Sequence, residues 1–182
     1  MELVAKPFIF LRHGETDWNK QGLSQGRTDI ALNAAGVAQA HAAAGLLRGQ
    51  GVTRIYSSTL GRAVRTAEIV GGVLGLTFEA DADLQEATFG AQEGQPMGRW
   101  YDDWVAGDYT PPGGEVFVDL RVRVVRAVNR VVAPPGLALI VAHGAMFRAL
   151  RSAMGLSPLV RTENGVPLWC EPGAPWELRP IG

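Results

Sequence analysis

The chain has 182 residues, of which 47% are hydrophobic and 19% are charged. This composition predicts one globular domain, spanning residues 1–182, with a sizeable core. The formal net charge of -1 argues against nucleic acid or an anionic membrane as the main partner, because both select a strongly basic surface. The single cysteine, Cys170, excludes an internal disulfide framework and fits a reducing compartment. The first residues show no signal peptide or membrane-spanning stretch, so we expect a cytoplasmic protein.

Strand-like apolar runs alternate with helical periodicities along the chain. The continuous apolar run at residues 8–11 predicts a strand covered on both faces. Asn33 is a candidate N-cap for a helix over residues 34–48, and Ser57 or Ser58 for a helix over 60–74. The remaining predicted elements are strands at 54–56 and 77–79, a short helix near 98–105 in the loop-like stretch 88–114, a helix over 115–132, a strand at 137–142, a helix over 145–154, and short edge strands at 166–169 and 176–178. This alternation predicts a layered α/β domain with right-handed crossovers.

Two of the three histidines directly follow predicted strands, and each precedes a glycine. Ligands of an open parallel sheet bind outside the carboxyl ends of its strands, so His13 and His143 can meet in one pocket. A neutral imidazole is a good nucleophile towards phosphorus, and the neighbouring Arg12 would hold phosphate oxygens and disfavour the protonated ring. The alternative for either histidine is a hydrogen-bonded structural role.

Two further segments carry charged groups suited to a phosphate site. Arg62 lies in the first turn of the helix predicted at 60–74, where anions are favoured, and Arg65 lies one turn later. The alternative is a surface helix with solvated arginines. In the segment 84–94, Glu86 or Glu93 is a candidate proton donor, provided that its pKa is raised from about 4.3 towards neutrality. These residues alone do not choose between the two glutamates.

Taken together, six ordered segments resemble those of the histidine phosphatase superfamily, also called the phosphoglycerate mutase-like family. The segments run from about residue 8 to residue 145. They are Leu11-Arg12-His13-Gly14-Glu15-Thr16 with Asn19; Gln25-Gly26-Arg27-Thr28-Asp29 with Leu32 and Gly36; Ser57-Ser58-Thr59-Leu60-Gly61-Arg62-Ala63 with Thr66-Ala67; Leu84-Gln85-Glu86 with Gly90 and Glu93-Gly94; Pro112-Gly113-Gly114-Glu115; and Val141-Ala142-His143-Gly144. The resemblance implies an α/β fold, a three-layer αβα sandwich with a mostly parallel central sheet.

The resemblance also implies a role for individual residues. His13 matches the nucleophile that forms a phosphohistidine, and Glu86 matches the proton donor to the leaving oxygen, whereas Glu93 matches a structural position. No metal or other cofactor is implied. The residues matched to substrate binding are Arg12, Asn19, Gln25, Gly26, Arg62 and His143. Fixed cations and N–H donors suit phosphoryl transfer, because charge gathers on the equatorial oxygens in its transition state.

The same site chemistry serves three different activities. We expect a phosphatase acting on a small phosphomonoester, in which water takes the phosphoryl group from His13. In the alternative, a mutase, the dephosphorylated product takes the group back at another oxygen. Gln25-Gly26 stands where mutases carry threonine-glycine, and the residues after Glu86 lack the arginine-histidine-tyrosine of mutases. A catalytically silent phosphate-binding domain is the third interpretation. The oligomeric state is not indicated by the sequence.

Other residues allow a functional and a structural interpretation. Trp100, Tyr101, Trp104 and Tyr109 either contact the leaving group of the substrate or pack under a long loop. The arginines of the helix predicted at 115–132 are interpreted as a solvated face rather than an anion site. These are Arg121, Arg123, Arg126 and Arg130. Val116 stands where many related phosphatases have serine or threonine, so an inherited substrate preference is not assumed.

Overall fold

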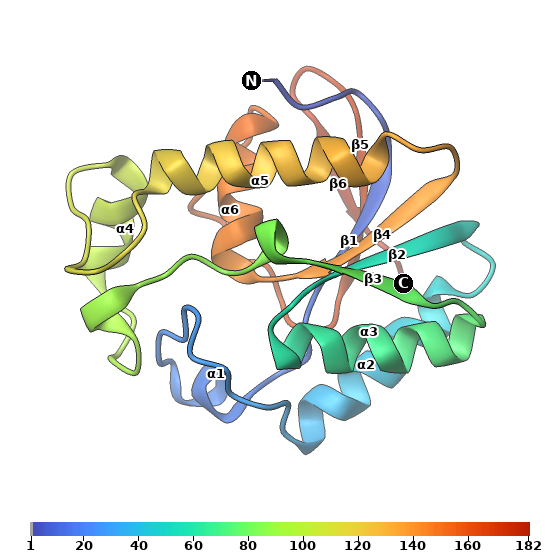
Figure 1. The fold of residues 1–182 in the computed structure, drawn as a ribbon, viewed down its shortest axis with the longest axis horizontal. Helices are drawn as coiled ribbons and strands as arrows, with labels where there is room; N and C mark the ends of the chain where they lie inside the picture. Colours follow the sequence, from blue (N-terminus) through green and yellow to red (C-terminus); the bar gives the residue numbers. More distant parts are fainter. Residues whose placement is uncertain (1) are drawn as a thin grey trace.

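A computed structural model describes residues 2–182 (Figure 1). Its elements, in chain order, are β1 (Phe8–Arg12), α1 (Asp17–Gln21), α2 (Ala34–Leu47), β2 (Val52–Ser58), α3 (Gly61–Leu74), β3 (Phe78–Asp81), the 3-10 turns Ala82–Leu84 and Gly90–Gln92, α4 (Arg99–Ala106), α5 (Phe117–Val132), β4 (Leu137–Ala142), α6 (Gly144–Ala153), β5 (Pro167–Glu171) and β6 (Glu177–Pro180). The strands form one sheet in the order β3-β2-β4-β1-β5-β6. The first four strands of this order are parallel to one another. Strand β5 is antiparallel to β1, and β6 is antiparallel to β5.

The alternation of side chains along β1 explains why the sheet is covered on both faces. Ile9 and Leu11 face a cluster that includes apolar residues of α2 and α3, whereas Phe8 and Phe10 face a cluster built with α5 and α6. All four side chains are fully buried. Figure 1 shows the same arrangement, with α5 on one side of the sheet and α2 and α3 on the other. The αβα sandwich with a mostly parallel sheet is therefore confirmed.

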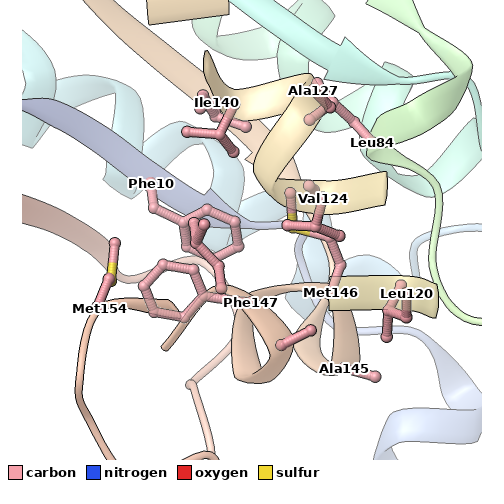
Figure 2. Close-up of a cluster of buried hydrophobic side chains, with 14 of the residues drawn as sticks. Phe10, Leu84, Leu120, Val124, Ala127, Ile140, Ala145, Met146, Phe147 and Met154 are labelled. Carbon is pink, nitrogen blue, oxygen red and sulfur yellow. The ribbon is translucent and has the colours of Figure 1, made fainter. Parts of the chain in front are cut away.

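The larger cluster joins the sheet to the start of α6 (Figure 2). Phe10 of β1 stacks on Phe147 of α6, with ring centroids 3.9 Å apart. Val124 of α5 and Met146 of α6 are also completely buried in this cluster. Large-to-small changes in such a core cost about 2–5 kcal/mol, so this packing fixes the position of the first turn of α6 firmly against the sheet.

The carboxyl ends of the central strands lie side by side. Arg12 of β1 pairs with Ala142 of β4, and Ser57 of β2 pairs with Val141 of β4. The backbone N–H of His13 donates to the carbonyl of Ala142 at 3.0 Å. Two segments separated by about 130 residues are thus brought together at the carboxyl ends of the parallel strands, as the placement of the histidines predicts.

Three details differ from the sequence-based expectations. Ser57 and Ser58 belong to β2, and the N-cap of α3 is Leu60, which makes no side-chain cap hydrogen bond. Strand β5 is not an edge strand, because it lies between β1 and β6. Helix α1 was not predicted, and its five residues are too short for a periodic pattern; it is defined by a capping box between Thr16 and Asn19.

Within residues 2–182, no helix is both long enough and apolar enough to cross a membrane.

Candidate active site

His13 is held in one tautomer and one orientation. Its Nδ1 lies 2.7 Å from the carbonyl oxygen of Gly14 and donates a proton to it, which leaves the lone pair on Nε2. The Nε of Arg62 donates to this Nε2 at 3.3 Å. Burial, followed by the charges of Arg62 and Arg12, holds the pKa of His13 well below 6.5. The ring is therefore neutral at physiological pH, with its nucleophilic nitrogen facing a cation.

His143 is the N-cap residue of α6 and lies next to His13. The two ring centroids are 5.2 Å apart, and Nε2 of His143 lies 2.7 Å from Oγ of Ser58. The Nδ1 is buried and has no hydrogen-bond partner among residues 2–182. Burial, the charge of Arg62 and the neighbouring His13 hold its pKa well below 6.5. A buried polar atom without a partner is uncommon in proteins and marks a place where a ligand can complete the hydrogen bonding.

Arg62 is fixed by carbonyl oxygens on the loop after α1. Its Nη2 donates to the carbonyl of Gly26 at 2.7 Å and its Nη1 to that of Thr28 at 2.9 Å. The carboxylate of Asp29 lies 3.5 Å from Nη1. These contacts leave the Nε edge of the guanidinium directed at His13, so the cation is preorganised beside the nucleophilic nitrogen.

Arg12 is partly buried and lies against the start of α6. Its Nη1 donates to the carbonyl of Thr162 at 2.7 Å, and its Nε has no partner in the described chain. Burial is the largest influence and lowers the pKa of Arg12 to about 10, while the charge of Glu86 acts in the opposite direction. A Cβ on Gly144 would lie 3.3 Å from the guanidinium carbon. The glycine after His143 therefore lets this cation lie against the helix.

Glu86 is held at the N-terminus of α6. Its Oε1 accepts from the N–H groups of Ala87 at 3.0 Å and Met146 at 2.8 Å, and its Oε2 accepts from Ala145 at 2.9 Å. The side chain is 7% exposed. The two oxygens are thus oriented by three backbone donors, at a helix end that favours negative charge.

Glu93 plays a different part, as the resemblance implies. Its carboxylate accepts from the N–H groups of Arg27, Thr28 and Phe89 and from the hydroxyl of Thr28. A Cβ on Gly26 would overlap this carboxylate. Glu93 therefore pins the loop whose carbonyl oxygens hold Arg62.

A cavity of about 230 Å³ lies over these groups. The structure brings seven of the eight residues singled out by sequence into its wall: Arg12, His13, Asn19, Gln25, Gly26, Arg62 and Glu86. His143, the eighth, is not among the residues of this wall, and its ring centroid lies 5.2 Å from that of His13. Among residues 2–182, no group of three or more His, Cys, Asp or Glu side chains is placed to hold a metal ion.

Sequence reasoning missed several residues at this site. The Nδ2 of Asn164 donates to the carbonyl of His13 at 2.9 Å and to Oδ1 of Asn19 at 3.2 Å. Arg148, Arg161 and Thr162 also line the cavity. The side chain of Asn164 ties the loop after α6 to the strand end that carries His13, although the two segments are about 150 residues apart.

The four aromatic residues of the segment 100–109 differ in position. Tyr101 lines the cavity, whereas Trp104 is fully buried and donates from Nε1 to the carbonyl of Glu115 at 2.8 Å. Trp100 is partly buried against Phe89. Trp100, Trp104 and Tyr109 are not in the cavity wall. One of the four is therefore placed to contact a ligand.

Arg123 corrects the interpretation of the α5 arginines as a solvated face. Its side chain is 13% exposed and binds both carboxylate oxygens of Glu115, at 2.9 and 2.7 Å. It also donates to the carbonyls of Asp83 and Gln85 at 2.8 and 2.9 Å, and to that of Glu86 at 3.4 Å. Arg123 thus braces the segment that carries Glu86.

Comparisons with known proteins agree with this geometry. A probable phosphoglycerate mutase GpmB of Yersinia pestis (strain Pestoides F) is 34% identical over 172 residues, covering 88% of this chain and 76% of that protein. A mycobacterial glucosyl-3-phosphoglycerate phosphatase, solved with VO3, has a TM-score of 0.81 at 29% identity over 98% of each chain. A phosphoserine phosphatase of Entamoeba histolytica, solved with 3-phosphoglyceric acid, has a TM-score of 0.77 at 25% identity over 90% of this chain and 89% of that chain.

The match extends to the family as a whole. The sequence model of the histidine phosphatase superfamily (branch 1) matches residues 8–164, a range that includes His13, Arg62, Glu86 and His143. The chain belongs to the histidine phosphatase superfamily.

Proposed function

We propose that residues 1–182 act as one catalytic domain, a phosphomonoester hydrolase that works through a phosphohistidine on His13. The observation that carries this proposal is the Nε2 lone pair of His13. His13, which carries this lone pair, lines the cavity together with Arg12, Arg62 and Glu86. The phosphatase names of two structural relatives support the same reaction. The substrate is a small phosphorylated metabolite, and we propose a cytoplasmic location.

In the first step, the hydrogen bond from Nε of Arg62 passes from Nε2 of His13 to a phosphoryl oxygen, which frees the lone pair of Nε2 to attack phosphorus. The N–P bond forms as the ester P–O bond breaks, and the carboxyl group of Glu86 gives its proton to the leaving oxygen. Its position at the edge of the cavity, fixed by Ala145 and Met146, supports this role. The products are an alcohol, phosphohistidine and the Glu86 carboxylate.

In the second step, a water molecule attacks the phosphohistidine. The carboxylate of Glu86 takes a proton from the water, the N–P bond breaks, and inorganic phosphate leaves. His13 is again neutral and Glu86 again carries its proton, so the cycle closes without an added reactant. The Nδ1–H of His13 donates to the carbonyl of Gly14 throughout, which stabilises the charge on the ring.

The charge of the transferring phosphoryl group requires fixed donors. Arg12 and Arg62 are held by backbone carbonyls, so they need no reorganisation when charge builds on the equatorial oxygens. The Nε of Arg12 and the Nδ1 of His143 are buried without partners in the described chain. We assign both atoms to phosphoryl oxygens, together with the side-chain amide of Asn19 and the segment Gln25-Gly26.

Phosphoglycerate mutase activity is the second candidate, because the Yersinia pestis relative carries that name. A mutase shares the first step with a phosphatase and differs in the acceptor of the second. The two activities are separated by the product: a hydrolase releases inorganic phosphate, and a mutase returns an isomer of the substrate.

The test is to incubate the protein with phosphomonoesters and to follow the products by phosphorus NMR. In parallel samples, the reaction is quenched rapidly without acid, so that the phosphorylated protein can be isolated. We expect phosphate release and an acid-labile phosphohistidine that maps to His13. The matched variant His13→Ala is expected to lose both signals, while His41→Ala, on the exposed face of α2, keeps them. Full activity in His13→Ala would refute the proposal.

A further inference from the structure

Two guanidinium groups in the cavity wall have no acceptor within residues 2–182. Arg148 of α6 and Arg161, in the loop between α6 and β5, both line the cavity. Over residues 2–182 neither side chain makes a hydrogen bond or an ion pair of its own, whereas Arg12 and Arg62 are tied to carbonyl oxygens. Arg148 and Arg161 therefore do not stabilise the fold through hydrogen bonds or ion pairs.

The charges of the wall exceed what one phosphoryl group can balance. The wall carries four guanidinium groups and one carboxylate, that of Glu86. A phosphoryl dianion bound at His13 is matched by Arg12 and Arg62. Arg148 and Arg161 then remain next to the same cavity, with the single carboxylate of Glu86 as the only other charge of the wall. Their influence reaches Arg12, whose pKa is lowered to about 10 by burial first and by the charges of Arg161 and Arg148 as well.

Arg148 is held in place by an aromatic ring. Its guanidinium carbon lies 4.7 Å from the ring centroid of Tyr101, which is itself 5% exposed and packed edge-on against Phe89. Such stacking fixes the plane of a guanidinium group without consuming its N–H donors. A planar, preoriented fork is suited to bidentate binding of an oxyanion.

Arg161 is tied to the phosphoryl site through its neighbour. The carbonyl of Thr162 accepts from Nη1 of Arg12 at 2.7 Å, so the backbone of this loop is anchored to a cation of the phosphoryl site. The wall beside these residues includes the apolar side chains of Leu23, Phe89 and Met97. The cavity thus combines two cationic regions with an apolar wall, at a volume below the about 300–1,000 Å³ of drug-sized sites.

We propose that Arg148 and Arg161 form a second anion subsite that binds an oxyanion on the leaving group, so that the preferred substrates are phosphomonoesters of small acidic alcohols. This inference rests on the proposed phosphatase function. The oxyanion is a carboxylate or a second phosphate. Two relatives are named phosphoserine phosphatase and glucosyl-3-phosphoglycerate phosphatase, and both names denote substrates that carry a carboxylate.

The test compares substrates that differ only in the second anion. 3-Phosphoglycerate and glycerol 3-phosphate differ by a carboxylate in place of a hydroxymethyl group. Fructose 1,6-bisphosphate and fructose 6-phosphate differ by a second phosphate. We expect kcat/KM of the wild-type protein to favour the more anionic member of at least one pair by about tenfold or more, mainly through KM. The pair with the larger preference identifies the oxyanion.

Arg148→Gln and Arg161→Gln are each expected to lower that preference by about tenfold. Arg148→Lys, which keeps the charge but not the stacked fork, is expected to fall between Arg148→Gln and the wild type. Arg99→Gln serves as the control, because Arg99 is 91% exposed on α4 and outside the cavity wall. It is expected to keep the wild-type preference. Thermal unfolding of each variant checks that it is folded.

Two results separate this inference from the proposed function. Equal kcat/KM within both pairs, with phosphohistidine formed on His13, overturns the second subsite and leaves the phosphatase intact. If neither pair is hydrolysed, the phosphatase proposal fails and the subsite is judged by calorimetric binding to His13→Ala. The subsite then requires tighter binding of the more anionic ligand and loss of the difference in His13→Ala/Arg148→Gln; equal affinities overturn it.

Discussion

Arg62 donates from its Nε to the Nε2 of His13 at 3.3 Å, and no other hydrogen bond to this nitrogen occurs within residues 2–182. A guanidinium group does not lose its proton in the physiological range, so the imidazole must act as the acceptor. The contact therefore fixes a neutral ring whose Nε2 lone pair accepts from Arg62, and it links the charge of Arg62 to the titration of His13.

The first prediction concerns the acid side of the pH–rate profile. Burial and the charges of Arg62 and Arg12 lower the pKa of His13 well below 6.5, so protonation of His13 does not reduce kcat/KM as the pH falls through 6.5. In Arg62→Gln one cause of that shift is removed, and the pKa is expected to rise. We expect an acid limb displaced to higher pH and a loss in kcat of about 10²–10³-fold.

The measurement is kcat/KM between pH 4 and pH 8 for the wild type and Arg62→Gln. Arg65→Gln is the matched control, since Arg65 lies one turn later on α3 and pairs with Glu68 on the surface. An unchanged acid limb in Arg62→Gln would show that its charge does not reach His13.

The second prediction concerns stability. His13 and His143 are buried with pKa values held well below 6.5 in the folded protein, whereas both titrate near 6.5 when unfolded. The unfolded chain therefore binds more protons below pH 6.5, and the free energy of unfolding falls on acidification. Each histidine contributes a slope of about 1.4 kcal/mol per pH unit between the two pKa values.

Urea unfolding measured between pH 5 and pH 7 tests this slope. His13→Ala is expected to reduce the pH dependence by about the contribution of one histidine, and His41→Ala, at an exposed position of α2, controls for the loss of a histidine as such. A slope that is the same in wild type and His13→Ala contradicts the assignment of a neutral buried ring.

The third prediction separates the two steps of the reaction. Glu86→Gln removes the proton donor but retains the size of the side chain, and the expected loss in kcat is about 10²–10⁴-fold for an alkyl phosphate. A substrate such as p-nitrophenyl phosphate, whose leaving group needs no proton, should form phosphohistidine at a nearly normal rate. Because the proposed mechanism also uses Glu86 as the base for water, the phosphohistidine should then accumulate.

Quenched-flow measurement of labelled protein gives both rates. Glu68→Gln, at an exposed position on α3, provides the control substitution. Equal losses for alkyl and p-nitrophenyl phosphates in the phosphorylation step would argue that Glu86 does not protonate the leaving oxygen.

The sequence predicts the sheet and the strand ends that carry the candidate site because both depend on local signals. Continuous apolar runs predict buried strands, and His13 and His143 are found at the ends of the two clearest runs, in β1 and β4. Asn33 was correctly identified as the N-cap of α2, since its side chain accepts from the N–H of Gly36. Each of these features depends on a few neighbouring residues.

Features that depend on distant contacts could not be predicted in this way. Asn164 follows no apolar run, and its contact with the carbonyl of His13 exists only because the loop after α6 returns to β1. Arg148 lies on a helix whose periodicity indicates a buried face but does not say which polar residue borders a cavity. Arg123 has the spacing of a solvated residue on α5, yet Glu115 and the carbonyls of the adjacent loop enclose it.

The last prediction tests whether Arg123 positions Glu86. Its guanidinium group binds Glu115 through both carboxylate oxygens and donates to the carbonyls of the segment that leads to Glu86. In Arg123→Gln the carboxylate of Glu115, 16% exposed, loses its bidentate partner, and we expect a loss of about 1–3 kcal/mol in the free energy of unfolding. Turnover of alkyl phosphates should fall more than that of p-nitrophenyl phosphate, because only the former needs Glu86 to be in place as an acid.

Arg126→Gln is the matched control, one turn along the same helix. Arg126 is 55% exposed and binds Asp83 at 3.2 Å, and such a surface ion pair contributes about 0–1 kcal/mol. The two variants are compared by urea unfolding and by the ratio of kcat for the two substrates. If Arg123 has a purely structural role, Arg123→Gln lowers the free energy of unfolding and leaves the ratio of kcat unchanged. If Arg123 positions Glu86, the variant also lowers this ratio in the folded protein.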